Sequence, residues 1–215
     1  ACRMPGYEQR KVYLPNSIIK ILVGDVTENL RNIIANTINP KIKDRFYLIV
    51  KDGYRPYPAS QFFYKWGLEN IENNPAAYVS SGISSHNRGW AVDITLGYMD
   101  DDGQLKEIWM GGIFDEFSEI SHFDNPGRDL NPDLDDVWSY KKRGYYDTRK
   151  LHKNLTSSIF RAVLKRAVVD AGGSPYSKEW WHFSFKNADF QNKGVCYKRH
   201  IMPSNIDQYY IDLDR

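Results

Sequence analysis

A histidine and an aspartate stand seven residues apart in the segment SSHNRGWAVDITL, which covers residues 84–96. His86 and Asp93 are both common metal ligands, and the glycine between them, Gly89, would let the backbone turn back on itself. The segment could be an ordinary hairpin whose polar residues face water, or it could supply two ligands of one metal ion. The apolar run that starts directly after Asp93 would place the pair beside a core.

A second segment that could do chemistry is EWWHFSF, at residues 179–185. A catalytic zinc takes three protein ligands and leaves a fourth position for water. His182, held between bulky aromatic residues, could be the third ligand, and Glu179 could take a proton from the water. The alternating pattern predicts a strand, in which residues 179 and 182 point to opposite faces. If both serve one site, we expect a bulge or a strand entry at Glu179.

The elements that must position these residues follow from the hydrophobic pattern. Residues 18–23 and 46–50 predict strands, and residues 155–173 predict a helix that ends at Gly172. A further helix is expected from near Ala59. The helix expected between the two strands has one apolar stripe, formed by Leu30, Ile33, Ile34 and Ile38, and Thr27 is placed to cap it. The later helix has one apolar face, formed by Ile159, Val163 and Ala167. Mixed helices and strands without a βαβ rhythm predict an α+β domain.

The composition limits the class of protein. A chain of 215 residues with 41% hydrophobic residues suits one domain, which we expect to cover residues 1–215. Within it, residues 1–40 form an N-terminal strand and helix region, and residues 100–154 form a loop-rich insertion that is a candidate lid. No stretch approaches the ~20 apolar residues of a membrane span. The balance of 29 basic and 27 acidic residues, without a block of like charge, argues against a nucleic-acid binder.

The two cysteines and the first residues bear on the compartment. Cys2 and Cys196 are too far apart for a C-x-x-C motif, and both one disulfide and two separate thiols stay open. The opening residues ACRMPGYEQR contain neither an initiator methionine nor an apolar signal region. This pattern is typical of an exported chain whose signal peptide has been removed, in the periplasm or at the cell surface of a bacterium. A sequence shortened at its start for any other reason would have the same pattern. A cytoplasmic location therefore stays open.

Together with DGYRP at residues 52–56, these segments resemble the VanX-type D-alanyl-D-alanine dipeptidases. These are zinc peptidases related to D,D-carboxypeptidases and, in fold, to hedgehog signalling domains. Their pattern S-x-H-x(6)-D, followed by E-x-W-H, is matched by SSHNRGWAVD and EWWH. The segment MGGIFDEFSEISH also resembles their M-G-x-x-F-D motif. The resemblance runs from about Tyr47 to Phe185 and implies a single α+β domain. A central, mainly antiparallel sheet with flanking helices and long loops would surround a zinc cleft.

The resemblance implies a role for each matching residue. His86, Asp93 and His182 would bind one Zn²⁺ per chain. Glu179 would act as the general base on the attacking water, and Arg55 would stabilise the oxyanion.

Two further residues fall at positions that the family uses around its bound dipeptide. Ser84 would contact the substrate, and Asp115 would suit its ammonium group. The implied activity is zinc-dependent hydrolysis of the small substrate D-Ala-D-Ala to D-alanine. It could serve glycopeptide resistance or the salvage of D-alanine from the cell wall. The sequence does not indicate the oligomeric state.

Two other functions stay open. The first is a D,D-carboxypeptidase or L,D-peptidase that acts on peptidoglycan stem peptides. The second is a non-catalytic zinc-binding recognition module, against which Glu179 and Arg55 both argue because neither is needed merely to hold a metal. Of the other histidines, His122 and His152 are expected at the surface.

Overall fold

The computed structural model describes Leu14, residues 16–129 and residues 144–185. Cys2, Cys196 and residues 130–143 of the expected insertion lie outside the described residues. The main elements are α1 (Asn16–Ile21), the π-helical turn η2 (Leu22–Val26), α2 (Thr27–Thr37), β1 (Phe46–Asp52), α3 (Tyr57–Asn70), β2 (Ala91–Met99), β3 (Leu105–Glu107), α5 (Ser157–Asp170), β4 (Ser174–Tyr176) and β5 (Glu179–Ser184). Short 3-10 turns cover Pro40–Arg45, Pro75–Ala77, Glu119–Ser121 and Thr148–Lys150.

The centre of the molecule is a five-stranded sheet in the order β1-β2-β5-β4, with β3 also paired to β2. Every strand pair in it is antiparallel. β2 is the central strand, and its residues from Ala91 to Tyr98 are all buried. The prediction of an α+β fold with a mainly antiparallel sheet is therefore confirmed.

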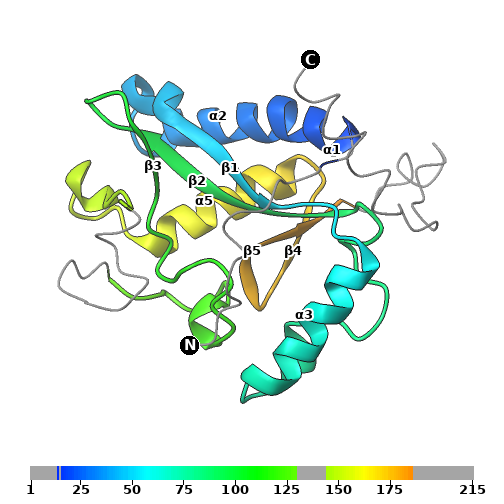
Figure 1. Ribbon diagram of the computed structural model, residues 1–215. Coiled ribbons are helices and arrows are strands. Elements are labelled where there is room, and N and C mark those ends of the chain that lie inside the picture. Colours follow the sequence, from blue (N-terminus) through cyan, green and yellow to red (C-terminus); the bar gives the residue numbers. More distant parts are fainter. Residues whose placement is uncertain (1–13, 15, 130–143, 186–215) are drawn as a thin grey trace.

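Two long helices cover the sheet together. Figure 1 shows α2 and α5 side by side, with α3 lying apart from this helical layer. Asn29 on α2 ties the two helices by donating its side-chain amide to the carbonyl oxygen of Ala167, at 3.2 Å. Most of the buried apolar residues of the described chain form one cluster, to which the sheet, α2, α5 and also Phe63 of α3 contribute. Within the described ranges, no helix combines the length and the apolar character that crossing a bilayer requires.

The strand predicted for residues 18–23 is wrong, because this segment is helical and continues through η2 into α2. The buried residues recur at intervals of four, which is a helical spacing: Ile18, Leu22, Val26, Leu30 and Ile34. An α-helix has about 3.6 residues per turn, so a stripe with this spacing drifts around the helix. The wider π turn at Leu22–Val26 reduces that drift and keeps the stripe against the core.

The cap predicted for the second helix is also wrong, because the helical backbone runs on through Thr27. The hydroxyl of Thr27 instead donates a hydrogen bond of 2.6 Å to the carbonyl oxygen of Leu22, inside the continuous helix. Within α2, Leu30 and Ile34 are buried as expected.

The predicted helix at residues 155–173 is present as α5, although its buried face differs from the expected one. Val163 and Ala167 are buried, but Ile159 is 37% exposed. Phe160 and Leu164 take the central place against the sheet instead. The helix ends as expected before Gly172, whose φ is +82°. The helix expected near Ala59 begins at Tyr57.

The strand β5 has the irregularity that the sequence required. Pro175 on β4 pairs with Phe183, whereas the next residue, Tyr176, pairs with Glu179. Three residues of β5 therefore lie opposite a single step of β4. This register shift lets Glu179 and His182 face the same side of the sheet, as a regular strand would not allow.

Candidate metal centre and active site

The site is built on a row of residues across three neighbouring strands. Asp52 at the end of β1 pairs with Asp93 on β2, and Asp93 pairs in turn with His182 on β5. Directly paired residues in an antiparallel sheet have side chains on the same face, about 5 Å apart. The strand register alone therefore brings Asp93 and His182 together, although 89 residues separate them in the chain.

The turn before β2 brings His86 to the same place. Its backbone is closed by hydrogen bonds from Trp90 N to Ser85 O (2.9 Å) and from Gly89 N to His86 O (3.1 Å). Gly89 adopts a φ of +67°, which favours glycine. The buried side chain of Asn87 anchors the turn, because its amide donates to the Arg55 carbonyl oxygen at 2.6 Å. The turn predicted from the glycine is therefore present.

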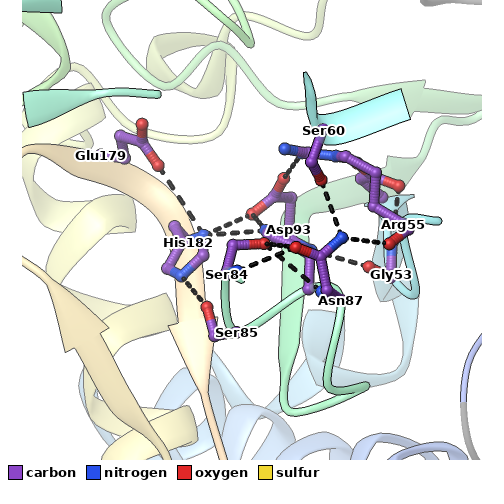
Figure 2. A network of polar contacts seen from close by, with 11 residues as sticks. Gly53, Arg55, Ser60, Ser84, Ser85, Asn87, Asp93, Glu179 and His182 are labelled. Carbon is purple, nitrogen blue, oxygen red and sulfur yellow. Dashed lines mark hydrogen bonds and ion pairs between the residues drawn. The ribbon is translucent and has the colours of Figure 1, made fainter. Parts of the chain in front are cut away.

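Three ligand atoms converge at this point, and Figure 2 shows two of the side chains that carry them, Asp93 and His182. His86 Nε2 lies 3.1 Å from His182 Nδ1 and 3.4 Å from Asp93 Oδ1. His182 Nδ1 lies 3.0 Å from Asp93 Oδ1. Zinc–ligand distances of 2.0–2.2 Å place the ligands of a tetrahedral ion about 3.3–3.6 Å apart. The observed separations are close to that range, so this group could hold a metal ion.

A hydrogen bond to His86 leaves its Nε2 free to face the other two candidate ligands. His86 Nδ1 lies 2.7 Å from the carbonyl oxygen of Gly53 and must donate to it, because a carbonyl oxygen only accepts. The lone pair of His86 is then on Nε2, toward the other two ligands. Metal-binding histidines are commonly oriented by such a second hydrogen bond.

The charge states of the group also suit a cation. Burial opposes ionisation of Asp93, yet the neighbouring His86 and His182 hold the pKa of its carboxyl well below the ordinary value. Burial lowers the pKa of His182, which favours the neutral imidazole despite the nearby carboxylate. One carboxylate and neutral imidazole nitrogen are the forms that bind metal ions.

Arg55 is held beside the ligand group by Asp52. Its Nε and Nη2 donate to Asp52 Oδ2 at 2.9 and 2.7 Å, and the Asp52 Oδ1 accepts from the Gly53 amide at 2.9 Å. Arg55 Nη2 then lies 3.9 Å from Asp93 Oδ2, and the guanidinium lies over the Phe63 ring at 4.9 Å. The guanidinium is therefore fixed in one orientation on a largely buried side chain.

Glu179 lies on the opposite side of His182 and points toward it (Figure 2). Its Oε2 is 3.7 Å from His182 Nδ1, and the residue is only 6% exposed. Burial raises the pKa of the Glu179 carboxyl well above its ordinary value, and the charges of Asp93 and Asp115 raise it further. A carboxylate with a raised pKa accepts a proton readily, as a general base must.

All seven residues singled out in the sequence line one cavity of about 490 Å³. Ser84 is held there by Asn87, whose side-chain oxygen accepts from the Ser84 amide at 2.8 Å. Asp115 has a φ of +61°, a left-handed conformation that is uncommon outside glycine but that aspartate adopts more often than most residues.

The sequence did not single out several residues that shape this cavity. Tyr78 and Tyr176 line it, and Asp52 and Asn87 hold Arg55 and the turn. Asp52 and Asn87 lie inside the recognised segments, so their positions carried a signal. Tyr78 lies in a segment without any periodic pattern and could not have been found that way.

The two other histidines differ from each other. His152 is exposed, as expected. His122 is half-buried rather than at the surface, because its Nε2 lies 3.1 Å from the hydroxyl of Tyr78.

Comparison with known families decides the relationship. Residues 20–201 match the peptidase M15 family, described as D-ala-D-ala dipeptidase. The chain belongs to this family. The resemblance drawn from the short motifs is therefore confirmed, and the match extends beyond them into both ends of the chain.

Three curated relatives carry the name D-alanyl-D-alanine dipeptidase. The protein from Enterococcus faecium is 30% identical over 160 residues, which is 67% of this chain and 65% of the relative. Those from Enterococcus faecalis and Streptomyces coelicolor are 28% and 26% identical over 151 and 156 residues. These alignments cover 63% and 66% of this chain, and 60% and 63% of the two relatives. The matched region thus spans less than two thirds of each relative.

Proposed function

We propose that the protein is a zinc-dependent dipeptidase that hydrolyses D-Ala-D-Ala to D-alanine. Family membership supports a peptidase of this kind. The observation that carries the proposal is the convergence of two imidazoles and one carboxylate, with Glu179 and Arg55 on either side, in one cavity.

His86, Asp93 and His182 would hold the zinc ion, and their spacing and hydrogen bonds support this role. Zinc in such a site polarises a carbonyl group and makes water acidic enough to lose a proton near neutral pH. The alternative of a non-catalytic metal module is disfavoured, because Glu179 and Arg55 lie beside the ligands without being needed to hold an ion.

The chain's own residues perform the remaining steps. The Glu179 carboxylate takes the proton of the attacking water and later passes it to the amine of the leaving D-alanine. The Arg55 guanidinium donates hydrogen bonds to the oxyanion that forms from the peptide carbonyl. Asp115 pairs with the ammonium group of the dipeptide, and Ser84 contacts the substrate from the turn that carries His86.

The size of the cavity favours a second candidate activity. About 490 Å³ is more space than a dipeptide of two alanines needs. A D,D-carboxypeptidase, which removes the last D-alanine from a longer stem peptide, would use such space.

The test compares D-Ala-D-Ala with a longer peptide that ends in D-Ala-D-Ala, each with and without a chelator. The proposal expects chelator-sensitive cleavage of the free dipeptide. Release of D-alanine only from the longer peptide would instead show a carboxypeptidase.

Two variants separate the roles of the residues, and elemental analysis gives a readout besides activity. Glu179→Ala should keep about one zinc per chain and lose hydrolysis, whereas His182→Ala should lose the zinc as well. Retained hydrolysis in the Glu179 variant would exclude that residue as the base.

A further inference from the structure

The loop of residues 110–128 forms part of the cavity wall and carries Asp115. Asp115 has a left-handed backbone, a conformation that aspartate adopts more readily than most residues other than glycine. Because Asp115 lies within the loop, the direction of its carboxylate depends on what fixes the loop. The contacts within the described residues show which groups hold this loop in place.

The two limbs of the loop touch at their base. The amide of Arg128 donates to the carbonyl oxygen of Gly111 at 2.7 Å. Gly111 has a φ of +84°, and a Cβ atom there would lie 2.8 Å from the Cα of Gly127. Only glycine allows this close approach. Near the tip, Glu116 Oε2 accepts from the Ile113 amide at 3.1 Å and closes the turn that contains Asp115.

One arginine reaches into this loop from the core. Arg161 lies on α5 and is only 1% exposed. Its Nε donates to the carbonyl oxygen of Met110 at 2.5 Å, and its Nη1 donates to those of His122 and Asn125, each at 2.9 Å. Met110 stands before Asp115, and the other two acceptors stand after it. A single rigid guanidinium thus ties both limbs of the loop to a helix that packs on the sheet (Figure 1).

The same guanidinium supports a second group in the wall. Arg161 holds the backbone of His122, and His122 Nε2 lies 3.1 Å from the hydroxyl of Tyr78. Tyr78 lines the cavity, whereas Arg161 and His122 do not. Arg161 therefore reaches the cavity wall in two ways, through the loop that carries Asp115 and through His122, which contacts Tyr78.

We propose that Arg161 is a positioning residue that fixes Asp115 and Tyr78 in the cavity wall and thereby sets how tightly the enzyme binds its dipeptide. This inference rests on the proposed function, in which Asp115 pairs with the substrate ammonium group. A structural role alone would lower stability without changing the Michaelis constant.

Arg161→Lys is the first test, because lysine keeps the charge but lacks the rigid planar fork of donors that reaches Met110 on one side and His122 and Asn125 on the other. The KM for D-Ala-D-Ala is expected to rise about tenfold or more, with kcat changed less than about threefold, since a misplaced binding group weakens substrate binding. In an Asp115→Asn background the same change should raise KM by a clearly smaller factor, because the part of the effect that passes through Asp115 is already lost and only the part through Tyr78 remains. A KM within about twofold of the wild type, or full additivity in the double variant, overturns the proposal.

Arg45→Lys is the matched control. Arg45 also donates its Nε to a carbonyl oxygen, that of Met99 at 2.7 Å. Its guanidinium lies over the ring of Tyr98, as that of Arg161 lies over the ring of Trp180. It does not line the cavity. Its substitution should lower the melting temperature and leave KM unchanged. An equal rise of KM in this control would overturn the specific role of Arg161.

Hydrogen exchange tests the inference independently of any activity. In Arg161→Lys, the amides of Ile113, Ser118 and Ser121, which are all bonded within the loop, should exchange faster while those of β2 stay protected. If the wild type hydrolyses no dipeptide, the proposed function fails, and this measurement still decides whether Arg161 fixes the loop. Uniform loss of protection, or loss of folding in both Arg161→Lys and Arg161→Gln, overturns the proposal.

Discussion

Replacing Asp52 with asparagine should loosen the orientation of Arg55 without removing a proposed metal ligand. Asp52 accepts hydrogen bonds on both oxygens, from the Gly53 amide on one and from the Arg55 guanidinium on the other. An asparagine side chain offers one acceptor and one donor. In either orientation its NH₂ group would therefore face a donor, either the Gly53 amide or the guanidinium.

The size of the effect follows from the burial of the pair. The two side chains are 10% and 8% exposed, so little water replaces the lost contact. Breaking a buried ion pair by removing one partner costs about 3–5 kcal/mol. A chain of this length loses about 2–4 °C in melting temperature per kcal/mol, so the expected fall is about 6–20 °C.

The catalytic effect should be smaller than the loss of Arg55 itself. Removing an oxyanion donor costs about 10²–10³-fold in turnover, and Arg55→Ala should reach that range. Asp52→Asn keeps the guanidinium but loosens its orientation, so kcat should fall about 10–100-fold while the zinc content stays unchanged.

Steady-state kinetics, calorimetry and elemental analysis together form the assay. Glu107→Gln is the control, because Glu107 forms a partly buried ion pair of 2.8 Å with Lys51 outside the cavity lining. It should lower the melting temperature and leave kcat unchanged. The reasoning is refuted if folded Asp52→Asn retains the wild-type kcat, or if its kcat loss is matched by the control.

Three further predictions concern the site and its walls. Titration of His182→Ala with zinc should show no tight site by equilibrium dialysis, and wild-type affinity would contradict its assignment as a ligand. Glu179→Gln should melt above the wild type in chelator at pH 8, with a difference that shrinks toward pH 5. Because folding raises the pKa of Glu179, the protonated carboxyl stabilises the folded protein at low pH, and this contribution to the free energy of unfolding is lost as the pH rises from 4.5 through the pKa of the folded state. An unchanged difference would speak against this charge penalty. Gly67→Ala should lower the free energy of unfolding by about 1–2 kcal/mol in a denaturant titration, since its Cβ would lie 2.6 Å from Val79 Cγ2; a stabilised variant would show that Val79 has room to move.

Two of the three strands that carry the site, β1 and β5, could be predicted from the sequence, because their patterns are local. β1 was visible as an apolar run and β5 as an aromatic alternation. The failure at residues 18–23 has an equally local cause. A run of β-branched residues suits a strand, and only its continuation to Leu30 and Ile34 reveals the helical spacing. The π turn that keeps this stripe in line leaves no signal in the residue types.

The candidate site could be assembled from motifs but not from distances. The motifs selected His86, Asp93 and His182, yet only the pairing of β2 with β5 shows why two of them meet. The groups that hold the site were harder to find, because their partners are backbone atoms. Arg161 donates hydrogen bonds to three backbone carbonyl oxygens. Every residue has such an oxygen, so the residue types do not indicate which ones accept.

The pairing of Asp93 with His182 also sets when the site can form during synthesis. A growing chain holds His86 and Asp93 early, but His182 follows 96 residues after His86. Before β5 has left the ribosome, the nascent protein can offer a metal ion only two of its three ligands. If these three residues hold a metal ion as proposed, tight binding of that ion therefore has to wait until β5 has paired with β2.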